Sequence, residues 1–468
     1  MERRVFCIMT LNDIIKGLGV TVLLPIIIFF LAVIFRIKFK KAFRSAVLIG
    51  IGFIGINLIL GFFLNNLAPA AQKMVKFTGV HLPILDVGWP AAAAIAFAGK
   101  IGLFVIPITV AVNFFMYVFH WTDTIDVDVW NYWHFAFTGG LVYAMTNNIW
   151  LGMLASAIDA MLVLVLGDWT APAVQEYYKI PNISLPHGFS AAYVPIAIPI
   201  NWLLDKLHLD KVKADPESIR KKWGFFGDPI IIGLILGLVV GFLGNLNALG
   251  TANAWFNILK LGMAMAGVMY IFPKMVAILM DGLIPISEGV REFMKARASN
   301  RKFYIGLDSA IAVGDPAAIA SAMILVPIAI ILMVIIPQNQ MLLAVDLAVL
   351  PFMVVMTIPI TRGNILKTVI IGTVIIAVGL LIGTNLSPLF TKAAIQAQFK
   401  MPSSATQISS ICDGSNPLTW FIVKFMNSWY GIAILFAVFF VFLYFYRKHR
   451  RTWEIIAGAT EKALEENK

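Results

Sequence analysis

Residues 313–318 read VGDPAA and place a carboxylate, Asp315, between a glycine and a proline in an otherwise apolar region. The same frame occurs at residues 87–92 as VGWPAA, with Trp89 in the place of the aspartate. The longer segments VGWPAAAAIA and VGDPAAIASA align without a gap, and each precedes an apolar run with an internal proline, FVIPITV or ILVPIAI. Apolar segments that Gly and Pro interrupt at corresponding places in two halves of a chain are typical of the broken helices that form transporter binding sites.

The composition around this motif indicates a membrane protein. The chain has 468 residues, of which 60% are hydrophobic and 13% charged, whereas soluble domains carry about 25% charged residues. Apolar runs of about 20 residues are long enough to cross a hydrocarbon core of about 30 Å. The clear spans are Leu18–Phe35, Ala46–Leu64, Pro229–Leu249, Ala317–Ile336, Ile365–Ile382 and Trp429–Tyr446. We therefore predict an all-α polytopic membrane protein.

The basic residues predict the orientation of the chain. The net charge is +11, and Lys and Arg gather at residues 36–44, 206–222, 291–302 and 447–451. Basic loops stay in the cytoplasm, so membrane orientation, and not nucleic-acid binding, explains the charge. We predict an N-terminus outside, a cytoplasmic C-terminus and about 11 crossings, with inverted repeats and some re-entrant or broken helices that surrounding protein covers.

The pattern predicts one membrane-embedded transporter domain over residues 1–468. We place a first repeat at about 10–204, a cytoplasmic linker at 205–227 and a second repeat at about 228–390. An external loop at 391–427, a last helix at 428–447 and a cytoplasmic tail at 448–468 follow. No loop is long enough for a catalytic domain, so a phosphate donor would be a separate polypeptide.

Cofactor and metal motifs do not occur in the sequence. Cys7 and Cys412 are far apart and belong to no CxxC or His-flanked pattern, so neither a metal site nor a redox motif follows. The chain also lacks a Walker A motif and a dinucleotide-binding fingerprint. We predict no metal and no cofactor.

Polar side chains inside apolar segments are costly and usually face a cavity or the helix bundle. Asp315 is the strongest candidate, and with Pro316 it forms a favourable helix start. It either caps a helix only, or caps the helix and also contacts substrate. His187, between Pro186 and Gly188, is a candidate donor, acid or base near neutral pH, or a histidine that the backbone satisfies.

Four further residues are candidates for substrate binding. His134 lies in WNYWHFAFT, either near substrate or in an aromatic belt at the membrane interface. Thr138 lies one turn later, on the same helix face. Asp86 and Trp89 flank the break of the first repeat, and the Trp89 indole offers a stacking face for a sugar.

Four long segments resemble the galactitol-type enzyme IIC, the membrane component of the bacterial phosphotransferase system. They are DVGWPAAAAIAFAG, ISLPHGFSAAYVPIAIPINWLLDK, GLDSAIAVGDPAAIASAMILVPIAI and AVLPFMVVMTIPITRGN. The resemblance extends from about residue 10 to about 450, and the related ascorbate-type enzyme IIC shares the architecture. The Gly-Ile-Thr-Glu signature of glucose-type relatives is missing, so their catalytic Glu has no counterpart here.

The resemblance implies a homodimer of 11-helix protomers in the bacterial cytoplasmic (inner) membrane, with a core that moves as an elevator. It implies that a separate enzyme IIB, which carries phosphate on its own cysteine and receives it through enzyme IIA, phosphorylates the substrate. Carried over by motif, it points to a group of substrate-binding residues: Asp86, Trp89, His134, Thr138, His187 and Asp315. We further predict catalytic roles for Asp315, which would accept the proton of the attacking hydroxyl, and for His187, as an acid or base near neutral pH.

The sequence therefore predicts a galactitol permease whose transport is coupled to phosphorylation by a partner. The chain would be the membrane subunit of a phosphoryl-transferring complex, with a polyol substrate and the lipid bilayer as its other partners. The alternatives are an ion-coupled polyol transporter, with Asp315 as the ion site, and an ascorbate-type enzyme IIC. A channel fits poorly, because no ring of repeated charges is visible.

Overall fold

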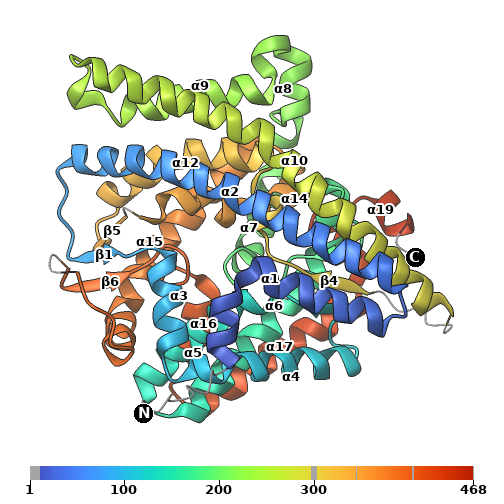
Figure 1. Ribbon diagram of the computed structural model, residues 1–468. Helices are drawn as coiled ribbons and strands as arrows, with labels where there is room; N and C mark the ends of the chain where they lie inside the picture. The colour runs from blue at the N-terminus through green and yellow to red at the C-terminus, as the bar shows by residue number, and fades with distance from the viewer. Residues whose placement is uncertain (1–10, 297–302, 344, 403–404, 467–468) are drawn as a thin grey trace, which may run out of the picture.

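The computed structural model describes residues 11–296, 303–343, 345–402 and 405–466, and most of them form α-helices (Figure 1). Among these residues, six helices are long and apolar enough to cross a membrane: α2 (Phe39–Thr78), α6 (Ile149–Tyr178), α10 (Ala252–Ala296), α12 (Pro316–Ile335), α15 (Ile365–Gln396) and α17 (Trp429–Lys448). Shorter apolar helices are α3 (Trp89–Ala98), α4 (Val105–Val118) and α9 (Pro229–Leu243), and α1 (Leu11–Ile34) contributes the apolar stretch Val22–Ile34. The prediction of an all-α polytopic membrane protein is confirmed, whereas the number of crossings stays a prediction.

Some helices differ from the spans expected from hydropathy. Helices α6 and α10 were not among the clear spans, because Asp159 and Asp168 interrupt the first and Lys260, Lys274 and Asp281 the second. The expected span Pro229–Leu249 is shorter, since α9 ends at Leu243 and a 3₁₀ turn follows at Leu246–Ala248. Hydropathy alone therefore detects apolar runs better than it places helix ends.

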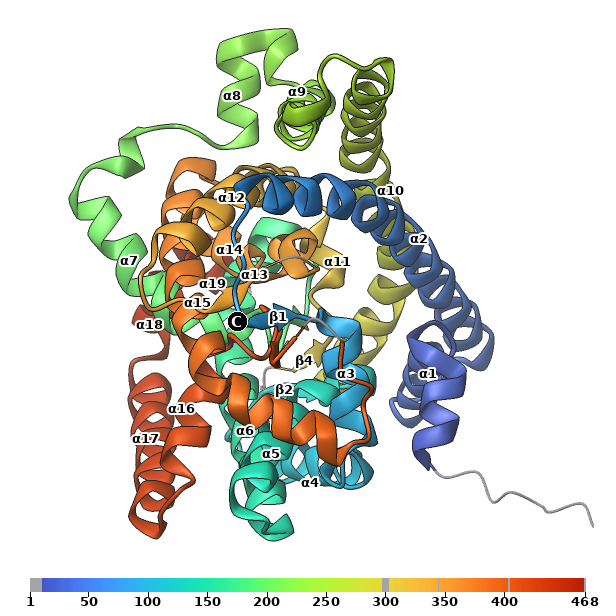
Figure 2. The ribbon, with the colours of Figure 1, turned by 90° about the vertical axis from the view of Figure 1, so that its left-hand side faces the viewer.

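The two longest helices pack against each other along one flank of the molecule (Figure 2). Helix α2 has 40 residues and α10 has 45, so each is about 60 Å long or more at 1.5 Å per residue. Small residues allow their close approach. A Cβ atom added to Gly52 of α2 would lie 2.6 Å from the Cα atom of Leu279 on α10, as is common where membrane helices pack tightly.

Nine shorter helices complete the described fold. Within the segment 391–427, expected to be a loop, α15 continues to Gln396 and α16 forms near its end. The tail after α17 folds back onto α6, where the Trp169 indole donates to the Trp453 carbonyl at 2.6 Å. The nine are α5 (Trp133–Thr146), α7 (Val194–Lys206), α8 (Pro216–Trp223), α11 (Ala310–Val313), α13 (Leu350–Val354), α14 (Thr357–Thr361), α16 (Pro417–Phe425), α18 (Arg450–Ile456) and α19 (Glu461–Glu466).

In the described part of the chain, six short strands form two parallel sheets of three strands each, with the orders β5-β1-β6 and β2-β4-β3. The middle strands β1 and β4 follow the long helices α2 and α10, and each lies between two strands from the other half of the chain. Pairing satisfies backbone N–H and C=O groups in segments that are not helical. The strands are β1 (Ile84–Asp86), β2 (Thr124–Asp126), β3 (Ile183–Ser184), β4 (Tyr304–Gly306), β5 (Met341–Leu342) and β6 (Gln407–Ser409).

The duplicated motif begins two helices. Helix α3 starts at Trp89 after Gly88, and α12 starts at Pro316 after its N-cap Asp315, which confirms the expected helix start. The two glycines serve different purposes. Gly88 has a φ of +82°, which favours glycine, whereas a Cβ on Gly314 would lie 1.7 Å from the Phe272 ring of α10.

Candidate functional site

A cavity of about 120 Å³ lies where the carboxyl ends of the two sheets meet. Five strands are followed within four residues by a side chain that lines it: Trp89 after β1, Trp130 after β2, His187 after β3, Asp308 after β4 and Cys412 after β6. Val349, seven residues after β5, lines it as well. The carboxyl ends of parallel strands are a common place for ligands. Aromatic faces beside a few convergent polar groups are typical of small-molecule sites. The remaining lining residues are Asn57, Leu60, Leu64, Asn131, Trp133, His134, Phe189, Ala310 and Phe352.

His187 and Asp308 approach each other because β3 and β4 are neighbours in one sheet. The Nδ1 atom of His187 accepts from the backbone N–H of Ser190 at 3.2 Å. A backbone N–H can only donate, so the ring proton lies on Nε2, which is 3.4 Å from Oδ1 of Asp308. The same oxygen accepts from the N–H of Ala310 at 2.8 Å. The cavity thus presents an imidazole donor beside a carboxylate.

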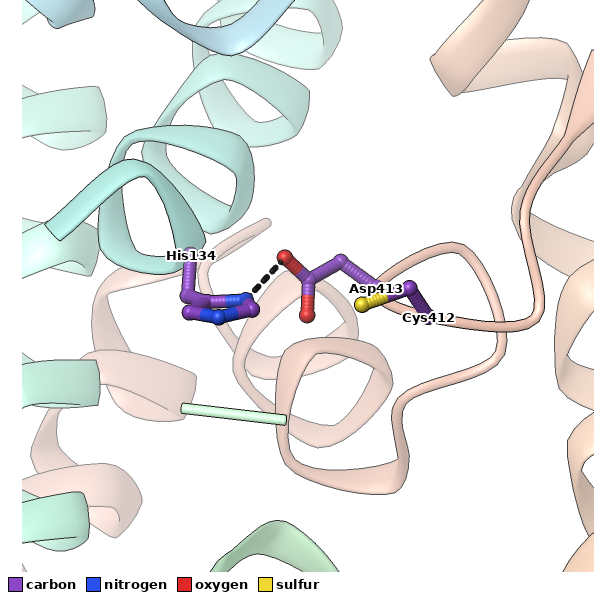
Figure 3. Close-up of side chains that lie close together, drawn as sticks. All are labelled: His134, Cys412 and Asp413. Carbon is purple, nitrogen blue, oxygen red and sulfur yellow. Dashed lines mark hydrogen bonds and ion pairs between the residues drawn. The ribbon is translucent and has the colours of Figure 1, made fainter. Parts of the chain in front are cut away.

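His134, the second residue of α5, forms the other polar pair of the site. Its Nδ1 atom lies 2.7 Å from Oδ2 of Asp413, which follows β6 (Figure 3). Both side chains are buried, and the Nε2 atom has no hydrogen-bond partner among the described residues. The rings of His134 and His187 are 4.6 Å apart between centroids. This approach requires Gly188, because a Cβ there would lie 2.5 Å from the Cβ of His134.

His134, Cys412 and Asp413 also form a group of metal-ligand types, with one donor atom from each within 4.8 Å of the others (Figure 3). Bond lengths of about 2.0–2.2 Å would separate the N and O ligands of a tetrahedral zinc ion by about 3.3 Å. The distance of 2.7 Å between His134 and Asp413 is that of a hydrogen bond. The arrangement therefore favours a hydrogen-bonded pair over two ligands of one ion.

Three of the residues predicted from sequence, Trp89, His134 and His187, line the cavity together. Two others hold neighbouring elements in place. Asp86 is fully buried, and its carboxylate accepts from the backbone N–H groups of residues 88, 345 and 346, which ties β1 to the segment after β5. Thr138 donates to Asp159 of α6 at 2.6 Å.

Asp315 is not among the residues that line the cavity. Its Oδ1 atom accepts from the N–H groups of Ala317 and Ala318 at 2.9 and 3.2 Å, and the Tyr177 hydroxyl lies 3.4 Å away. These contacts are those of a helix N-cap. The structure thus confirms that Asp315 caps α12, whereas its contact with substrate stays a prediction.

Sequence reasoning missed several residues of the site, above all Asp308 and Asp413. Both lie close after a strand, in LDS and CDG. One signal was available, because Ile183-Ser184 precedes His187-Gly188 much as Ile408-Ser409 precedes Asp413-Gly414. The strands concerned are only two and three residues long, so no alternation of apolar and polar residues marks them.

Comparison with known proteins identifies relatives along most of the chain. Residues 13–404 match the family EIIC-GAT, described as the PTS system sugar-specific permease component. The chain is 36% identical over 416 residues to the "Putative permease IIC component" of Escherichia coli (strain K12), which covers 89% of this chain and 93% of that protein. It is 34% identical over 411 residues to the "PTS system galactitol-specific EIIC component" of the same strain, which covers 88% of this chain and 89% of that protein.

Proposed function

The chain belongs to the family of sugar-specific permease components (EIIC) of the phosphotransferase system. From this membership we propose that it transports a hexitol, and that this hexitol is galactitol. Transport would be coupled to phosphorylation of the substrate by a separate enzyme IIB, which enzyme IIA supplies with phosphate. The assignment of galactitol as the substrate rests on the 34% identity to a galactitol-specific EIIC component over 88% of the chain.

The cavity is chemically suited to a polyol. Each hydroxyl can both donate and accept a hydrogen bond, and the cavity offers the Asp308 carboxylate as an acceptor beside the Nε2–H donor of His187. The indoles of Trp89 and Trp130 supply apolar faces for the C–H groups of the carbon chain. The hydroxyl that contacts both His187 and Asp308 would be the one that attacks the phosphorus of the phosphocysteine on enzyme IIB. Its proton would pass to the carboxylate, and the cysteine would leave as a thiolate when the S–P bond breaks.

The remaining features of the proposal concern the assembly. The protein would be a homodimer in the bacterial inner membrane, with its N-terminus outside and its basic C-terminal tail in the cytoplasm. The long helices α2 and α10 would serve as the frame along which the cavity-bearing core moves as an elevator. The basic loops support the orientation through the positive-inside rule.

The experiment that tests the function is uptake of labelled galactitol into vesicles that contain the protein. The vesicles are loaded with enzyme IIB and its phosphate donor chain, and the donor is supplied or withheld. We expect label to accumulate as sugar phosphate only with the donor. Free galactitol that accumulates without the donor would instead indicate an ion-coupled transporter, and ascorbate taken up in place of galactitol would reassign the substrate.

Variants connect this uptake to the cavity. Asp308→Asn should abolish phosphorylation, because the amide cannot take the proton of the attacking hydroxyl. Asp228→Asn is the matched control, since Asp228 caps α9, is not among the cavity-lining residues, and is replaced by an equally good cap. Full activity of Asp308→Asn would show that the substrate is not phosphorylated in this cavity.

A further inference from the structure

We propose that Asp413 is a positioning residue that makes His134 a hydrogen-bond donor to the substrate, with the proton of its Nε2 atom directed at a hydroxyl oxygen of the polyol. This inference rests on the proposed function. It concerns a residue after β6 that lies in a different half of the chain from His134 and that the motifs of the sequence did not indicate.

The first step concerns the hydrogen bonds of Asp413. Its Oδ2 atom faces Nδ1 of His134 at 2.7 Å, and its Oδ1 atom faces Nδ2 of Asn416 at 3.4 Å. The amide orientation of Asn416 is determined, because its Oδ1 atom accepts from the N–H groups of Leu418 and Thr419. The nitrogen of the amide must therefore face Asp413, and it also donates to the Gly188 carbonyl at 3.0 Å.

The second step concerns charge. Asp413 is 0% exposed and His134 is 2% exposed, and no Lys or Arg forms an ion pair with Asp413 among the described residues. A buried pair with a net charge and no counter-ion is costly, so the pair is neutral as a whole. Because Oδ1 of Asp413 faces the NH₂ donor of Asn416, a carboxyl proton belongs on Oδ2, between the carboxyl and Nδ1. Two neutral arrangements then exist: a carboxyl that donates from Oδ2 to a neutral imidazole, or a carboxylate with an imidazolium. In both of them the Nε2 atom of His134 carries a hydrogen.

The third step concerns what that hydrogen is for. The Nε2 atom of His134 is buried and has no partner among the described residues, although His134 lines the cavity. A buried donor without a partner is rare in a folded protein. A ligand oxygen in the cavity would satisfy it. His134 and His187 would then present two imidazole donors, 4.6 Å apart between ring centroids, to neighbouring hydroxyl oxygens of one polyol.

The substitution Asp413→Asn distinguishes this inference from the alternative in which Nε2 of His134 carries no hydrogen in the wild type. Because Asn416 presents its NH₂ group, the new side chain turns its carbonyl to Asn416 and its own NH₂ to Nδ1 of His134. Nε2 then keeps its hydrogen, and galactitol affinity should stay within a few-fold of wild type. Asp413→Leu leaves Nδ1 without a partner, so both neutral forms of the ring coexist, and affinity should fall only in proportion to the fraction of rings that keep the hydrogen on Nε2, about twofold if the two forms are equally populated.

The ring is observed directly by NMR of the full-length protein labelled with ¹⁵N-histidine, without any ligand, and His134→Gln assigns the signals. We expect a protonated Nε2 of His134 in the wild type and in Asp413→Asn, and a mixture in Asp413→Leu. Asp228→Asn is the control, because this carboxylate caps α9 and is not among the cavity-lining residues, so its loss should leave the His134 signal unchanged.

An unprotonated Nε2 in the wild type, or one that gains its proton only in Asp413→Asn, would overturn the inference even if galactitol is transported. An Nε2 atom that is as fully protonated in Asp413→Leu as in the wild type would also overturn it, because Asp413 would then not determine the position of the proton. Failure of the wild type to bind galactitol would refute the proposed substrate instead, while a protonated Nε2 would still support the role of Asp413.

Discussion

Asp315 can be tested as a helix cap and as a catalytic base with two substitutions. Its Oδ1 atom accepts from the backbone N–H groups of Ala317 and Ala318. Asp315→Ala leaves both of these donors without the cap, and the loss of an N-cap costs about 1 kcal/mol, up to about 2 kcal/mol. Asp315→Asn retains a carbonyl oxygen in the same place, and Asn and Asp are equally good caps. We therefore expect unfolding free energies that fall by about 1 kcal/mol in the first variant and by a few tenths in the second.

The assay measures stability and activity on the same preparations. Equilibrium unfolding in mixed micelles reports the free energy of unfolding, and phosphorylation of galactitol by enzyme IIB reports function. Asp228 supplies a matched pair of controls, because it caps α9 from the same Asp-Pro sequence, with Oδ1 accepting from the N–H of Ile230 at 2.9 Å. Asp228→Ala should cost a similar free energy, and Asp228→Asn almost none.

Two results would refute this reasoning. A stable Asp315→Asn variant that binds galactitol but no longer supports phosphorylation would show that the carboxylate acts as a base. An Asp315→Ala variant as stable as the wild type would show that the cap contributes nothing, although the Asp228→Ala control lost stability.

Three further perturbations follow from the packing and the charges. Gly188→Ala places a Cβ 2.5 Å from that of His134 and should displace the ring, lowering galactitol affinity about tenfold. Gly140→Ala on α5, with open space around its added Cβ, should bind as the wild type does, and equal affinities of the two variants would contradict the argument. Gly314→Ala should destabilise the fold by about 1–3 kcal/mol through overpacking against Phe272. Thermal unfolding should show that the double variant Gly314→Ala/Phe272→Ala loses less stability than the sum of the two single variants. Strictly additive losses would contradict this explanation. Burial raises the pKa of Asp123, but Arg450 and Arg447 outweigh burial and hold the pKa below its ordinary value of 3.8. A carboxyl with a lowered pKa in the folded state stabilises above its unfolded pKa and loses this contribution as the pH falls through the folded value. The stability difference between the wild type and Asp123→Asn should therefore be present near pH 7 and shrink as the pH falls below about 4. A difference that does not change with pH would remove the ionic explanation.

The local features of this protein could be predicted from sequence because each depends on a few consecutive residues. Membrane insertion depends on the length and polarity of apolar runs, which identified four of the six long helices directly. The start of α12 was predictable as well, since a carboxylate before a proline satisfies the first N–H groups of a helix in any context. His134, His187 and Trp89 were found because polar or aromatic side chains beside breaks in apolar segments are conspicuous.

The tertiary structure alone decided which polar groups meet. Strands of two or three residues are too short to show an alternation of apolar and polar residues. Their pairing across the two halves of the chain, which brings Asp308 to His187, therefore leaves no pattern in the neighbouring sequence. The contact between His134 and Asp413 likewise depends on how the segment after β6 packs against α5. Capping and hydropathy are properties of neighbours along the chain, whereas the cavity is formed by the ends of six strands that only the packed helices bring together.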